Sequence, residues 1–198
     1  KFIFINSVLI KEQSETRFLE ASNPDGAFTL FHPRTMHLVY DVDHYNDKFY
    51  IRTNLDALNF RLMECTLDKT AKENWKEVIA HRPDVYLESF TLFKEHMVIS
   101  ERAKGLMNIR VINQKDKSEH YLSFDEPAYD ASLNVNPDFN TNVLRFSYES
   151  LITPASIYDY NMDTRERELK KQQEILGGYN KDDYATERFF VAARDGVK

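Results

Sequence analysis

Phe2-Ile-Phe-Ile-Asn-Ser7 begins a strand pattern that decides the fold, because three later stretches match it column by column. These stretches are Phe49-Tyr-Ile-Arg-Thr-Asn54, Met97-Val-Ile-Ser-Glu-Arg102 and Leu144-Arg-Phe-Ser-Tyr-Glu149, and the four begin 47, 48 and 47 residues apart. A second strand-like stretch follows each of them, at Arg17–Ala21, Asn59–Met63, Asn108–Ile112 and Ser156–Tyr160. A repeat of about 40–50 residues that holds several short strands is the period of a propeller blade.

The stretches between these strands complete the predicted blades. Met36–Asp43 leads through the turn residues Asn46-Asp47 into Lys48–Arg52, which is the pattern of a hairpin. Outer strands are expected at Phe28–Phe31, Trp75–Ile79 and His120–Phe124. We therefore predict an all-β fold, a partial β-propeller of about three to four blades, each a four-stranded antiparallel sheet. A two-sheet sandwich fits the composition but not the constant period.

The last part of the chain is harder to assign. Thr164–Leu176 has a high helix propensity, but it has no clear apolar stripe, so an outer strand is favoured and a helix stays the alternative. Gly177–Tyr184 has the composition of a loop. Ala185–Arg194 is predicted as a strand, and Asp195-Gly196 as the start of a hairpin turn. The predicted domains are residues 1–174, the propeller blades, and residues 175–198, a linker that ends in one strand.

Composition excludes several classes of partner. The net charge of −6 argues against binding to nucleic acid or to an anionic membrane surface, which require a clustered basic field. No apolar run approaches the roughly 20 residues that span a bilayer. The single cysteine rules out an internal disulfide framework, so we expect a cytoplasmic location. The chain begins at Lys1 without an initiator methionine, which suits a part of a longer protein.

Few residues suggest a reactive site. Asp41, Asp43 and His44 could bind a metal, but hydrogen bonds that cap a turn are the favoured interpretation. The six histidines lack a metal-ligand spacing, and we expect them at strand edges or in loops; they are His32, His37, His44, His81, His96 and His120. Cys65 lies within a predicted strand, so a buried, inert thiol is expected. We predict no metal and no cofactor.

Two pairs of adjacent opposite charges occur in predicted strands, Glu101-Arg102 and Glu187-Arg188. Neighbouring side chains in a strand point to opposite faces, so the members of each pair do not contact each other. Such charges could line the axial channel of a propeller and steer a charged peptide. Pairing between blades or simple solvation is the favoured interpretation.

Taken together, several motifs resemble the prolyl oligopeptidase family of serine peptidases, and within it the oligopeptidase B (protease II) branch. The resemblance covers essentially all 198 residues. The motifs that carry it are Leu87–Phe93, Val98–Arg102 with Gly105-Leu106, Phe124–Tyr129, Ile152–Thr164, and Tyr184–Gly196, with Asp43-His-Tyr45 ahead of Phe49–Arg52.

The resemblance implies a seven-bladed propeller that caps an α/β-hydrolase domain and admits only short peptides. It implies a Ser-Asp-His triad and, for the oligopeptidase B branch, cleavage after Lys or Arg. This chain would supply roughly the second half of the propeller and the first strand beyond it. None of the five glycines forms the Gly-x-Ser-x-Gly elbow, so no catalytic residue is predicted here and the triad is expected downstream of Lys198.

The resemblance also implies partners and a candidate hinge. The expected partners are short basic peptides, the absent hydrolase domain and the remaining blades. Because the cut faces of the terminal blades should be apolar, the isolated chain is expected to self-associate. The connection between the domains would be a hinge or a passive linker, and its candidate hinge residues are Tyr184, Glu187, Arg188, Arg194, Asp195 and Gly196. A non-catalytic propeller scaffold is the alternative, although Trp75, the only tryptophan, is followed by Lys76 and not by aspartate.

Overall fold

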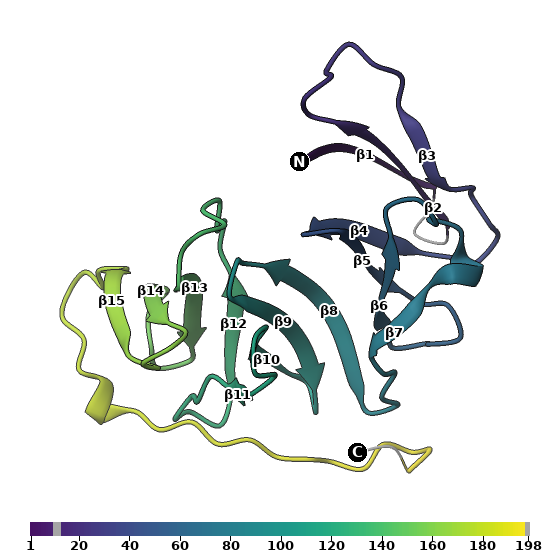
Figure 1. Cartoon of the computed structure of the whole chain (residues 1–198). Coiled ribbons are helices and arrows are strands. Elements are labelled where there is room, and N and C mark those ends of the chain that lie inside the picture. The colour runs from purple at the N-terminus through teal and green to yellow at the C-terminus, as the bar shows by residue number, and fades with distance from the viewer. Residues whose placement is uncertain (10–12, 197–198) are drawn as a thin grey trace. The chain divides into compact units, whose positions relative to one another are not determined.

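The computed structural model describes residues 1–9 and 13–196, and these residues form four β-sheets (Figure 1). The first sheet holds β1 (Phe2–Leu9), β2 (Gln13–Glu20) and β3 (Thr29–His32). The second holds β4 (Tyr40–Tyr45), β5 (Lys48–Thr53), β6 (Arg61–Thr66) and β7 (Lys76–Ile79). The third holds β8 (Val85–Leu92), β9 (His96–Ala103), β10 (Leu106–Asn113) and β11 (Glu119–Tyr121). The fourth holds β12 (Tyr129–Leu133), β13 (Val143–Ser150), β14 (Ser156–Asn161) and β15 (Arg167–Gln172).

The order of the strands in each sheet follows their order in the chain. Each sheet thus corresponds to one predicted repeat. The four matching stretches, which begin at Phe2, Phe49, Met97 and Leu144, lie on β1, β5, β9 and β13. This arrangement confirms an all-β partial propeller, in which the first sheet has three strands among the described residues and the others have four. The described residues also contain two short 3₁₀ turns, Lys72–Asn74 between β6 and β7 and Lys181–Asp183 after β15. Within residues 1–9 and 13–196, no helix is long or apolar enough to cross a bilayer.

Burial explains why the central strands have their sequences. In β5 every residue from Phe49 to Thr53 is buried, and in β9 every residue from His96 to Glu101 is buried. Strands covered on both faces need apolar side chains at consecutive positions, as the sequence indicated. β13 alternates instead, with Leu144, Phe146 and Tyr148 buried between exposed or half-buried neighbours.

The chain divides into two compact units, one formed by Lys1–Leu92 with Glu101–Lys104 and one by Phe93–Ser100 with Gly105–Lys198. Each unit has its own apolar cluster. The first gathers aromatic and aliphatic side chains around Phe49, including Phe31, Tyr40 and Trp75. The second gathers Val98, Ile109, Leu144, Phe146 and Tyr160, among others.

Two sequence predictions about the end of the chain had different outcomes. The stretch Thr164–Leu176 contains β15, whose residues are all exposed and pair with β14, so the outer strand is confirmed and the helix is wrong. Ala185–Arg194 was predicted as a strand, but the part of the chain described after β15 contains none. The apolar run there has β propensity but no neighbouring strand, and a strand needs a partner for its backbone groups. Val197 and Lys198 lie outside the described residues.

The expectation of apolar terminal faces needs a correction. Ile3 and Ile5 on β1 are 41% and 49% exposed, as expected for an uncovered apolar face. The outer face of the fourth sheet is polar instead, with Asp130, Ser147 and Glu149 at adjacent positions. Most large apolar side chains of this sheet, among them Leu144, Phe146 and Tyr160, belong to the core cluster on the opposite face, whereas Ile157 lines the outer face. Self-association of the isolated chain therefore stays a prediction, and this polar face does not support it.

Candidate functional site

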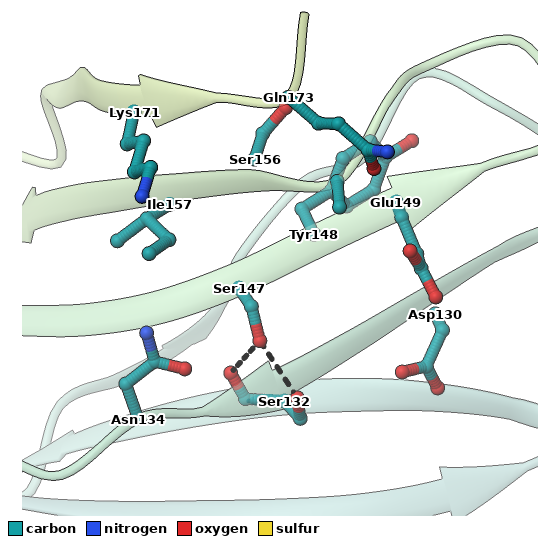
Figure 2. Close-up of a pocket in the computed structure, with 11 residues that line it drawn as sticks. Asp130, Ser132, Asn134, Ser147, Tyr148, Glu149, Ser156, Ile157, Lys171 and Gln173 are labelled. Atoms are coloured by element: carbon teal, nitrogen blue, oxygen red, sulfur yellow. Dashed lines mark hydrogen bonds between the residues drawn. The ribbon is translucent and has the colours of Figure 1, made fainter.

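A groove of about 550 Å³ on the outer face of the fourth sheet is the largest hollow among those described (Figure 2). Its floor is a pair of facing serines, since Ser132 Oγ and Ser147 Oγ lie 2.8 Å apart. Asp130 and Glu149 are directly opposite each other on β12 and β13. The other lining residues are Asn134, Tyr148, Ala155, Ser156, Ile157, Lys171 and Gln173.

This groove lacks the elements of a hydrolytic site. A serine nucleophile needs a base within hydrogen-bond reach, usually histidine. Ser147 bonds to Ser132, and no histidine lines the groove. The lining of this groove therefore holds no serine–histidine pair.

The candidate hinge residues do not form one cluster. Tyr184 ends the second 3₁₀ turn and stacks on Tyr179, with ring centroids 5.6 Å apart. The Arg188 guanidinium lies 4.7 Å from the centre of the Phe190 ring. Glu187 and Arg194 are exposed. Arg194, Asp195 and Gly196 belong to a final turn, in which Gly196 has a φ of 83°. Their role as a hinge stays a prediction.

Three residues that the sequence analysis did not single out hold this segment to the fourth sheet. Lys181 contacts Glu126 and Thr153, which belong to the loops before β12 and β14. Glu126 and Thr153 lie within stretches that carried the family resemblance, so their motifs were noticed but their partner was not. Lys181 is one lysine of a polar loop, and nothing in its local sequence marks it.

Asp41, Asp43 and His44 have separate roles. Asp41 Oδ2 accepts a hydrogen bond of 2.7 Å from Arg52 Nη1, whereas Asp43 Oδ1 accepts one of 2.7 Å from the His44 backbone N–H. The His44 ring packs on Phe2, with centroids 4.8 Å apart. Within the described residues, no group of three or more His, Cys, Asp and Glu side chains could hold a metal. The hydrogen bond between the His44 N–H and Asp43 lies within β4, just before the turn at Asn46-Asp47, so the capping of that turn stays a prediction.

The histidines lie at strand ends and in loops, but two of them are more buried than their positions suggested. His32, the last residue of β3, is 5% exposed, and His96, the first of β9, is 2% exposed. His96 Nε2 lies 3.1 Å from Asp163 Oδ1. His120 Nε2 lies 2.8 Å from the Tyr160 hydroxyl. The first contact ties the loop after β14 to the start of β9, and the second joins β11 to β14.

The charged pair Glu101-Arg102 behaves as the strand geometry requires. The Glu101 side chain is 2% exposed and forms an ion pair with Arg82, in the connection between β7 and β8. Arg102 points elsewhere, with Nε 3.8 Å from Glu88 Oε2. The ion pair of Glu101 with the connection between the second and third sheets agrees with the expected pairing between blades, whereas Arg102 pairs with β8 of its own sheet.

Cys65 is a buried thiol on β6, with 4% of the residue exposed. Burial, and then the charge of Glu64, raise the pKa of this thiol to about 12. Only the thiolate reacts with alkylating agents. We expect iodoacetamide at pH 8 to modify Cys65 more than about 100-fold more slowly in the folded protein than in guanidinium. Mass spectrometry of timed samples measures both rates, and equal rates would contradict the burial.

Comparison with known proteins identifies the family. The family model for the prolyl oligopeptidase N-terminal beta-propeller domain matches residues 1–173. The chain belongs to the prolyl oligopeptidase family. Among curated members, dipeptidyl aminopeptidase BI of Pseudoxanthomonas mexicana is 44% identical over 197 residues, 99% of this chain and 27% of the relative. Protease 2 of Moraxella lacunata is 31% identical over 199 residues, 100% of this chain and 28% of the relative.

Solved structures of the prolyl oligopeptidase family share the fold. Oligopeptidase B from Trypanosoma brucei, in a closed form with covalently bound antipain, has a TM-score of 0.87 and 25% identity, and the match covers 100% of this chain and 29% of that chain. Oligopeptidase B from Leishmania major has a TM-score of 0.82 and 25% identity over 94% of this chain and 28% of that chain. The chain spans little more than a quarter of the length of these relatives.

Proposed function

We propose that this chain is a propeller segment of a serine oligopeptidase that hydrolyses short peptides after Lys or Arg. The observation that carries the proposal is the close match of all four sheets to oligopeptidase B, with a TM-score of 0.87 over the whole chain. The segment itself serves as a filter. A ring of packed blades leaves a passage that admits an extended peptide and excludes a folded protein.

The chemistry comes from a catalytic domain outside the 198 residues. There a serine attacks the scissile carbonyl, a histidine takes and returns the proton, and an aspartate orients the histidine. In this proposal the chain contributes none of these groups. Ser118 lines the same groove as His96 and His120, but its hydroxyl donates a hydrogen bond to Asp116 Oδ1. Residues 1–174 form the blades and residues 175–198 the connection to that domain. The enzyme works on cytoplasmic peptides.

The test compares three samples. The full-length protein is expected to hydrolyse a small arginyl amide and a short Arg-containing peptide, and to leave the same peptide sequence intact inside a folded protein. The 198-residue chain alone is expected to show no turnover of the arginyl amide. Turnover by the isolated chain would overturn the placement of the catalytic groups, and cleavage of the folded protein would overturn the filter.

A second specificity is favoured by one observation. The 44% identity with dipeptidyl aminopeptidase BI exceeds the 31% identity with Protease 2. A dipeptidyl aminopeptidase removes dipeptides from a free amino terminus, whereas an oligopeptidase also cuts internal bonds. Acetylating the amino terminus of a test peptide discriminates between them. An oligopeptidase retains its rate on the blocked peptide, and a dipeptidyl aminopeptidase loses it.

A non-catalytic scaffold remains the alternative from another class. It predicts that the full-length protein has no peptidase activity on any of these substrates. Labelling with a fluorophosphonate probe adds an independent check, because the probe reacts with an activated serine whatever the peptide specificity. Absence of labelling would favour the scaffold.

A further inference from the structure

The chain beyond β15 turns back on itself at two glycines. Gly177 and Gly178 have φ values of 94° and 91°, a conformation that other residues rarely adopt. A Cβ added to either would meet no atom within 4 Å, so the turn lies in open space. The backbone at this point thus has a conformation that favours glycine, with open space on the side where a side chain would lie.

Directly after the glycines the chain is held firmly. Lys181 Nζ lies 2.6 Å from Glu126 Oε1 and 3.0 Å from Thr153 Oγ1, and Thr153 Oγ1 donates a hydrogen bond to the same Glu126 oxygen. The three polar groups therefore form a closed triangle. The Tyr179 hydroxyl donates a further hydrogen bond to the Ile152 carbonyl.

The Glu126 side chain is mostly covered, which distinguishes this ion pair from those on the surface. Its side chain is 9% exposed, whereas Glu168, the partner of Lys170 on β15, is 73% exposed. Burial by itself would raise the pKa of Glu126, but the hydrogen bond with Lys181 and those with its other partners outweigh burial, and the pKa is lowered. A buried carboxylate depends on its partners much more than a solvated one does.

The sheet side of the contact is rigid. Ser150 Oγ accepts hydrogen bonds from the backbone N–H groups of Ile152 and Thr153, at 3.0 and 2.8 Å. Thr153 is 7% exposed. On the other side, the backbone N–H of Tyr184 bonds to the Lys181 carbonyl, which closes a compact turn around the lysine. The loop around Thr153 and the turn around Lys181 thus contact each other through the hydrogen-bonded group of Glu126, Thr153 and Lys181.

We propose that Glu126, Thr153 and Lys181 form a latch that fixes residues 179–184 to the fourth sheet. The latch sets the point at which the following chain leaves this sheet. Tyr184 then belongs to the fixed part, and bending of the connection is restricted to the residues after it. Beyond the latch, Arg188 Nη2 lies 3.5 Å from the position that a Cβ would take at Gly105, in the turn after β9.

Hydrogen–deuterium exchange of the full-length protein tests the latch without reference to activity. Lys181→Met removes the charge and keeps the aliphatic stem. Backbone amides of residues 179–184 are expected to exchange about tenfold faster in this variant, because exchange follows the population of the detached state. Thr153→Val, which keeps the ion pair but removes the hydroxyl, is expected to give a smaller rise.

Lys170→Met is the matched control, since it removes a lysine from an exposed ion pair on β15. Exchange at residues 179–184 should not change in this variant. A peptide from β13 serves as the internal reference for the fold of the sheet. A rise confined to residues 179–184 supports the latch. No rise in Lys181→Met, an equal rise in the β13 peptide, or the same rise in Lys170→Met would overturn it.

Discussion

Phe49→Ala is expected to lower the free energy of unfolding of the first unit by about 4 kcal/mol. Phe49 is fully buried near the start of β5. Its ring centroid lies 5.0 Å from that of Phe18 and 5.2 Å from those of Phe2 and Phe31. These rings come from three strands of the neighbouring sheet. Removing Phe49 leaves a cavity that their packing cannot close without moving whole strands.

The only tryptophan gives a direct measurement of this effect. Trp75 is 6% exposed and belongs to the same cluster as Phe49, with its ring centroid 6.2 Å from that of Phe31. Denaturant unfolding followed by tryptophan fluorescence therefore reports on the first unit. Phe189→Ala is the matched control, because Phe189 is 76% exposed, and its effect should stay within about 0.5 kcal/mol. A loss below about 1 kcal/mol in Phe49→Ala would contradict the packing.

Phe49 also shows which part of the fold was predictable. A central strand with both faces covered requires consecutive apolar residues, and this requirement leaves a local signal that recurs in each blade. Ala185–Arg194 has the same local signal, with Phe189, Phe190 and Val191 in sequence, yet the structure places no strand there. Local sequence encodes the tendency to form a strand, whereas pairing depends on what lies alongside.

The contacts that position side chains were less predictable for the same reason. Glu126 and Lys181 are 55 residues apart, and each looks like an ordinary surface charge in its own stretch. Burial of Glu126 depends on the loop around Thr153, which no periodicity describes. For Glu101, strand geometry excluded Arg102 as the partner. It could not name Arg82, since loops do not constrain which side chain reaches a strand.

The partners of Arg52 could not be predicted from its local sequence either. Substituting Arg52 is expected to give the second large loss of stability. Arg52 follows Phe49 by three positions on β5, but its side chain is not part of the apolar cluster. Nε donates to the Leu87 carbonyl at 2.8 Å, and Nη1 donates to Asp41 at 2.7 Å. The guanidinium stacks 3.8 Å above the ring of Phe60, a residue with a φ of 63° that is strained for an aromatic side chain. One side chain thus joins β4, β8 and the turn before β6.

Arg52→Ala is expected to lower the free energy of unfolding by about 3 kcal/mol, since it removes two charge-assisted hydrogen bonds and the stacking contact. Arg52→Lys should recover less than half of this loss, because an ammonium has neither the fork of donors nor the flat face of a guanidinium. Arg145→Ala is the matched control: Arg145 makes two hydrogen bonds of 2.7 Å to Asp159, but its side chain is 50% exposed.

Arg145→Ala should therefore reduce stability by less than about 1 kcal/mol. Tryptophan fluorescence reports the loss for the Arg52 variants, and thermal unfolding by circular dichroism compares all three proteins. If Arg52→Lys were as stable as the unsubstituted protein, the charge alone would suffice and the stacked geometry would have no energetic role. If Arg52→Ala and Arg145→Ala had equal effects, burial would not distinguish the two arginines. The expected order follows from exposure, since the same guanidinium chemistry contributes most where water cannot replace it.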